Sequence, residues 1–137
     1  MRMTRRKAVG SALGGLAAMT AVLSSAHAAK AAGTRHCLTV LYPWKSDARF
    51  DFDYYVDKHL PMLRQLYGKS VGKMDVHKGL NRSDGSPPGF VGGVTVEITS
   101  MEAFDAAANE HRAKLIADVP DFSNITPIAQ IDEIVDV

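Results

Sequence analysis

The spacing of hydrophobic residues alternates along the chain between a period of two and a period of 3.6, and this alternation restricts the fold. A period of two is typical of β-strands with one buried face, and a period of 3.6 is typical of amphipathic helices. After residue 34 the two periods predict six elements, with no internal repeat and no long linker. We expect strands at 36–44, 71–80, 90–98 and 125–137, and helices at 51–67 and from 99–102 to about 118.

Residues at the helix ends support this division. Asp51 or Asp53 is expected to cap the first helix, because a short polar side chain can accept from the unpaired N–H groups of the first turn. Gly68 is expected to end that helix. Thr99 and Glu102 have the spacing of a capping box, which predicts the start of the second helix.

The predicted order is β-α-β-β-α-β, which indicates the α+β class. Short right-handed crossovers then give a ferredoxin-like fold, a four-stranded antiparallel sheet with both helices on one face. The strands at 90–98 and 125–137 carry apolar residues on both faces, so the face without helices would expose apolar surface. Pairing of two sheets would bury that surface, and we therefore expect a homodimer.

The first 28 residues are typical of a secretory signal peptide. Basic residues up to Lys7 precede an apolar run, Ala8–Leu23, and the small-residue triplet Ala26-His27-Ala28 follows. The alternative is a membrane anchor, but a run of 16 residues rich in Ala and Gly is short for a span that needs about 20. We expect cleavage after Ala28, which would leave no membrane anchor.

The sequence therefore predicts three segments: a cleaved signal peptide at 1–28, a short extension at 29–36 and one domain at 37–137. The segment Thr4–Lys7 is similar to a twin-arginine export signal, although general secretion remains the alternative. We expect the mature protein to be exported to the periplasm or the extracellular space.

The charge balance excludes one class of partner. Of the 16 basic residues, four lie in residues 1–28, which hold no acidic residue, so the rest of the chain has 12 basic against 15 acidic residues and a net charge of −3. A mildly acidic domain has no electrostatic footprint for nucleic acid. The single cysteine, Cys37, excludes an internal disulfide and a multi-cysteine metal cluster.

Two histidines lie at the centres of the two predicted apolar helix stripes. His59 belongs to the first stripe and His111 to the second, and Ala107 and Ala108 beside His111 leave room over the sheet. The stripes comprise Phe52, Tyr55, Val56, His59, Leu63 and Leu66, and Phe104, Ala107, Ala108, His111 and Leu115. Either histidine can be a core residue with a satisfied hydrogen bond. The alternative is that both line one pocket between helices and sheet, where imidazole can bind an anion, hold a metal or move a proton near neutral pH.

Pro61 lies inside the first predicted helix. It has no N–H for the carbonyl of Asp57, one turn from His59, which predicts either a kink at a pocket wall or a simple packing adaptation. On the strands, Asp75 and His77 share a face but lack the third ligand that a metal site needs.

The sequence has no glycine-rich phosphate loop, no G-x-S-x-G elbow and no H-E-x-x-H motif, so no standard cofactor site is predicted and the cofactor stays unknown. We expect an inert buried thiol at Cys37. The pair Gly92–Gly93 indicates a bulge or a close backbone approach within its strand.

Four segments, in order, make the chain resemble the EthD-like family over residues 37–137. They are Val40–Pro43, Arg49–Met62 with the pattern Y-Y-x-x-x-H-x-P, Ala117–Ser123 and Pro127–Ile131. The resemblance implies a dimeric α+β barrel and a role as an "EthD family reductase", an oxidoreductase. His59 falls on the histidine of the family pattern, so the resemblance points to it first.

Two functions follow as expectations. In the first, the protein is an oxidoreductase that acts on a small hydrophobic or aromatic molecule in the helix–sheet pocket, with His59 as the acid–base or orienting group and His111 and Tyr55 assisting. In the second, it is a non-catalytic dimer that holds a small ligand or haem in the same pocket.

Overall fold

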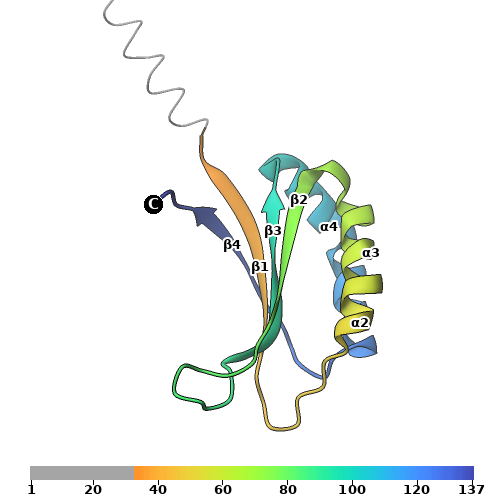
Figure 1. Cartoon of the computed structure of the whole chain (residues 1–137). Helices are drawn as coiled ribbons and strands as arrows, with labels where there is room; N and C mark the ends of the chain where they lie inside the picture. Colours follow the sequence, from red (N-terminus) through yellow and green to blue (C-terminus); the bar gives the residue numbers. More distant parts are fainter. Residues whose placement is uncertain (1–32) are drawn as a thin grey trace, which may run out of the picture. The chain divides into compact units, whose positions relative to one another are not determined.

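The structure is a computed structural model, and it describes residues 33–137 (Figure 1). The predicted signal peptide at 1–28, its cleavage site and residues 29–32 lie outside the described residues. The strands are β1 (Arg35–Pro43), β2 (Val71–Lys78), β3 (Phe90–Ile98) and β4 (Ile128–Ile134), and the helices are α2 (Phe52–Tyr54), α3 (Leu60–Tyr67) and α4 (Met101–Asp118). A π-helical turn, Tyr55–His59, joins α2 to α3. Short 3-10 turns, Gly68–Ser70 and Val119–Asp121, follow α3 and α4.

The four strands form one antiparallel sheet in the order β2-β3-β1-β4. Figure 1 shows α2, α3 and α4 on the same side of this sheet. This arrangement confirms the predicted α+β, ferredoxin-like fold. Its physical basis is the alternation along the central strand β1, where Tyr42 is fully buried on the helix side.

The first helix is continuous across Pro61 because it contains one wider turn. The Leu60 N–H donates to the carbonyl of Tyr55, five residues back, and this π-helical turn ends just before Pro61. A proline cannot donate to the carbonyl four residues back, and here a single π turn directly before Pro61 lets the helix continue. We therefore assign the turn to a packing adaptation at the wall of the cavity described below.

The π turn also shifts the buried face of the first helix. Tyr55, His59 and Leu63 are buried as the 3.6 period predicts, but Val56 is 47% exposed and its predicted place in the stripe is wrong. Leu60 is buried instead. An extra residue in one turn rotates every later side chain, so a strict 3.6 period loses its phase there.

The element ends match the prediction with small differences. Asp51 caps α2, where its carboxylate accepts from the Tyr54 N–H, and Gly68 ends α3 with a positive φ of 55°. The cap of α4 is Ser100, whose hydroxyl accepts from the Ala103 N–H, so the capping box expected at Thr99 does not form. In addition, β1 already begins at Arg35, within the segment 29–36 that the sequence predicted as an extension.

The final strand is shorter than the predicted 125–137. It spans Ile128–Ile134, and Ile125 lies before it as a buried core residue. In β3, a Cβ added to Gly93 would lie 2.5 Å from the Val40 carbonyl oxygen, so the predicted close backbone approach is confirmed.

The face of the sheet without helices is partly apolar and partly polar. Leu41 and Ile128 are opposite each other on this open face. Thr39, two residues before Leu41 in β1, lies on the same face. Ile128 is 50% exposed. Within residues 33–137, no helix combines the length and the apolar character that crossing a membrane requires.

Candidate functional site

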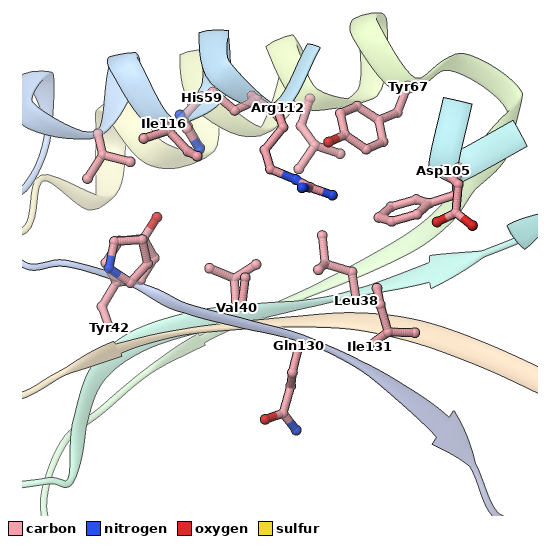
Figure 2. Close-up of a pocket in the computed structure, with 16 residues that line it drawn as sticks. Leu38, Val40, Tyr42, His59, Tyr67, Asp105, Arg112, Ile116, Gln130 and Ile131 are labelled. Atoms are coloured by element: carbon pink, nitrogen blue, oxygen red, sulfur yellow. The ribbon is translucent and has the colours of Figure 1, made fainter. Parts of the chain in front are cut away.

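A cavity of about 480 Å³ lies between the helices and the sheet (Figure 2). Most of its wall is apolar, with Leu38 and Val40 from β1 below and Leu115 and Ile116 from α4 above. Ile131 of β4 lines one side of the cavity. Because Ile131 is 43% exposed, the cavity opens to solvent on this side. A cavity of this size and lining suits a small hydrophobic molecule of one or two rings.

His59 is the imidazole that lines this cavity. It is the last residue of the π turn and only 6% exposed, as expected for a side chain that points toward the sheet. Its Nδ1 lies 2.8 Å from Oδ2 of Asp118, the last residue of α4. Figure 2 shows the ring directed from the helix layer into the space above the sheet. With Nδ1 engaged by the carboxylate, Nε2 is the nitrogen available to a bound molecule.

The Asp118 carboxylate forms two side-chain hydrogen bonds beside the cavity. Its Oδ1 accepts from the Tyr54 hydroxyl at 2.8 Å, and its Oδ2 pairs with His59. The hydrogen bond to Asp118 is the largest cause that raises the pKa of Tyr54 to about 12, so Tyr54 stays protonated and donates. The carboxylate is therefore held from both sides and fixes the ring orientation of His59.

The electrostatics favour a neutral His59 beside an ionised Asp118. Burial lowers the pKa of His59 below 6.5, against the opposing effect of the nearby carboxylate. Burial raises the pKa of Asp118, but the hydrogen bonds from His59 and Tyr54 outweigh it and keep this pKa below 3.8. At neutral pH the Nδ1–H then donates to Asp118, and Nε2 carries a free lone pair, which is the state of a general base.

These two shifts predict how stability depends on pH. Both folded-state pKa values lie below their unfolded values, so the unfolded chain binds more protons as the pH falls, and the free energy of unfolding decreases with it. The contribution of His59 to the free energy of unfolding is present above pH 6.5 and is lost as the pH falls below 6.5. In this range the free energy of unfolding falls by at most about 1.4 kcal/mol per pH unit because of His59. That of Asp118 is lost below about pH 3.8.

Urea unfolding measured from pH 8 to pH 2 tests this dependence. The variant His59→Gln should keep the decrease at the lowest pH values but lose most of the decrease that begins near pH 6.5. An unchanged curve for His59→Gln would show that His59 does not titrate with folding.

Tyr55 and His111 do not line the cavity. Tyr55 is 1% exposed and packs behind His59, with a ring-centroid separation of 5.5 Å and nearly parallel planes. Burial raises its pKa, the neighbouring Tyr42 hydroxyl raises it further, and its hydroxyl therefore stays protonated. Tyr55 thus supports the His59 ring by stacking, and direct contact with a ligand would fall to Tyr42, which does line the cavity.

The expectation that His111 faces the pocket is not met. Its side chain is 27% exposed and lies 3.6 Å from the Glu110 carboxylate. The cavity runs along the flank of α4 that carries Arg112 and Ile116, and His111 lies on the other flank of the buried stripe. Helical periodicity places a residue on the buried side, but it does not say on which flank a cavity opens.

Three side chains of the candidate site were missed from the sequence: Asp118, Arg112 and Tyr67. Asp118 reaches His59 across 59 residues of sequence, which local spacing does not reveal. Arg112 and Tyr67 face each other across the two helices and both line the cavity. The one available signal was the resemblance at Ala117–Ser123, a segment that contains Asp118.

The other sequence candidates lie on the strands. Asp75 belongs to the open face and pairs with Lys73 at 3.2 Å, and His77 lies two residues further along the same face. Cys37 is a buried free thiol in β1. In the described part of the chain, no group of three or more His, Cys, Asp or Glu side chains is placed to hold a metal ion.

The sheet order, the helices that cover one face and the apolar cavity beneath them define a ferredoxin-like α+β protein with a helix–sheet pocket. Among solved structures, the chain is similar to an EthD-like protein from Ralstonia eutropha JMP134, with 37% identity over 74% of this chain and 93% of that chain and a TM-score of 0.70. The chain therefore belongs to the EthD-like family, as the sequence resemblance predicted.

Two further structures show weaker similarity. An EthD family protein from Bacillus halodurans C-125 is 16% identical over 70% of this chain and 98% of that chain, with a TM-score of 0.48. A dimeric ferredoxin-like protein from Thermobifida fusca YX is 16% identical over 74% of this chain and 92% of that chain, with a TM-score of 0.46. No family model matches the chain, and no curated protein does.

Proposed function

We propose that this EthD-like protein is an exported oxidoreductase that acts on a small hydrophobic or aromatic molecule bound in the helix–sheet cavity. The observation that carries the proposal is the pairing of His59 with Asp118 at 2.8 Å on the wall of an otherwise apolar cavity. A histidine whose second nitrogen is held by a carboxylate is the usual arrangement of a general base.

The chain's own residues would supply proton transfer. His59 takes a proton from an acidic O–H or C–H of the ligand through Nε2, and the electron pair of that bond stays on the ligand. Asp118 stabilises the imidazolium that forms, and the apolar wall excludes water from the resulting anion. The anion is then oxidised by dioxygen as the co-substrate: a hydroquinone loses two electrons and two protons to become the quinone, and dioxygen takes up both electrons and both protons to become hydrogen peroxide.

Oxygen uptake tests this proposal. The purified protein is mixed with a panel of hydroquinones and phenols of one and two rings, and oxygen consumption is recorded against a protein-free control. Protein-dependent consumption that saturates with the added phenol supports the oxidoreductase. Saturable binding of panel members without any turnover would contradict it.

A non-catalytic carrier is the second candidate. It is favoured by the apolar lining of the cavity, which is sufficient to hold a hydrophobic ligand without chemistry. Mass spectrometry of the native protein distinguishes the two functions, because a carrier retains its small ligand or haem unchanged after isolation, whereas an enzyme releases product.

We also propose that the protein acts as a homodimer that buries the open sheet face. The support is the apolar part of that face, where Ile128 is 50% exposed beside Leu41. The substitution Ile128→Lys places a charge in the proposed interface and should shift the mass in analytical ultracentrifugation from two chains to one. The control is Val56→Lys, because Val56 is 47% exposed on the helix layer and should not affect assembly. A monomeric wild-type protein would contradict the proposal.

A further inference from the structure

The cavity holds one cationic side chain in a largely apolar wall. Arg112 extends from α4, and Figure 2 shows its guanidinium group directed into the cavity, between His59 and Tyr67. Among residues 33–137, the ion pairs within 4.0 Å do not include Arg112. A guanidinium stays charged at every physiological pH and presents a planar set of donors that matches a carboxylate.

Tyr67 adds a hydroxyl at the same place. The residue is 6% exposed at the end of α3, and Figure 2 shows its hydroxyl turned toward Arg112. Burial raises the pKa of Tyr67, and the nearby Arg112 guanidinium opposes this effect. The Arg112 guanidinium and the Tyr67 hydroxyl together provide hydrogen-bond donors and a positive charge, which suit a compact anion.

We propose that the cavity selects small aromatic or alicyclic carboxylates, with the carboxylate held by Arg112 and the Tyr67 hydroxyl. The ring system then lies over Leu38 and Val40, and its other end reaches His59. This inference rests on the proposed function because both place the ligand in the same cavity. It adds the chemical class of that ligand, a carboxylate. Arg112 is an exposed residue whose side chain reaches the cavity wall, so solvent screens part of this pairing.

Asp105 is the other charged residue of the cavity wall. It lies two helical turns before Arg112 on α4, at the far end of the cavity in Figure 2, and it is exposed. Its carboxylate repels an anion, so a bound carboxylate is directed to the Arg112 end. The variant Asp105→Asn should therefore tighten the binding of an anion without changing that of a neutral analogue.

The test compares 2-naphthoate with 2-naphthamide, which have nearly the same shape but differ in charge. Their dissociation constants are measured by isothermal titration calorimetry at pH 8, where naphthoate is ionised. Wild-type protein should bind naphthoate about tenfold more tightly, as expected for a bidentate, charge-assisted pair. The variant Arg112→Gln should abolish this preference and leave the affinity for naphthamide nearly unchanged. The matched control is Arg64→Gln, which removes an exposed arginine of α3 outside the cavity and should keep the preference.

Three results would overturn the inference: equal affinities for the two probes in the wild type, an undiminished preference in Arg112→Gln, or no binding of either probe at millimolar concentration. The variant His59→Gln should keep the naphthoate preference, because Arg112 and Tyr67, not His59, hold the carboxylate. Turnover of neutral phenols without a naphthoate preference would refute the carboxylate site alone. A clear naphthoate preference without turnover would refute the oxidoreductase alone.

Discussion

The variant His59→Gln is expected to lose turnover by about 10²- to 10⁴-fold in kcat, the usual contribution of a positioned general base. A glutamine can still donate to Asp118, but it has no lone pair of suitable basicity on the cavity side. Ligand affinity should change little, since the apolar wall and Arg112 are retained. The measurement is the rate of oxygen consumption with the best phenol of the panel, together with its dissociation constant.

The variant Asp118→Asn separates the chemistry of His59 from its packing. In the wild type, the Asp118 carboxylate accepts a hydrogen bond from Nδ1–H of His59 at 2.8 Å. An asparagine amide would instead donate to Nδ1, and the imidazole proton would then reside on Nε2. Asp118 is thus a positioning residue, and its loss should reverse the ring tautomer in ¹⁵N NMR spectra while the fold persists.

Wild-type kcat/KM should rise with pH and reach its plateau near neutral pH, because the pKa of His59 lies below 6.5. Full turnover in His59→Gln would contradict the proposed base.

The variant Phe122→Ala is expected to lose about 3–5 kcal/mol of unfolding free energy, a large part of the 5–15 kcal/mol typical of a domain. Phe122 is 0% exposed and lies at the centre of an aromatic cluster. Its ring centroid is 4.6 Å from that of His59 and within 5.9 Å of those of Tyr42, Phe50, Tyr54 and Tyr55. Alanine would leave a cavity that these rings can fill only in part.

Urea unfolding measures this loss, with Phe90→Ala as the matched control. Phe90 is 41% exposed at the start of β3, so its truncation should cost less than about 1 kcal/mol. If Phe122→Ala does not fold, Phe122→Leu keeps most of the volume and should show a smaller loss of the same sign. Equal losses for Phe122→Ala and Phe90→Ala would show that the cluster is not central to stability.

Much of the fold could be predicted because its signals are local. Alternation along β3 and the end signals Asp51 and Gly68 each depend on residues within a few positions of one another. The errors occurred where local signals compete. Pro61 introduced a π turn that exposed Val56, and Ser100 capped α4 in place of Thr99.

The candidate site was predicted in part. The buried position of His59 followed from helical periodicity and from the family pattern. The same periodicity misled for His111, because the buried stripe of α4 and the cavity-lining flank of α4 are different faces. Tyr55 lies next to the site as a packing partner of His59.

By itself, the sequence determined the order of the elements, the family and the imidazole that points to the sheet, because each depends on short-range spacing or on ordered motifs. Only the tertiary structure decided what surrounds that imidazole. Asp118 reaches His59 from the end of another helix, and Arg112 meets Tyr67 where α3 and α4 lie over the same cavity. Contacts between residues far apart in the chain depend on helix rotation and on the position of each helix over the sheet, and these are set by packing.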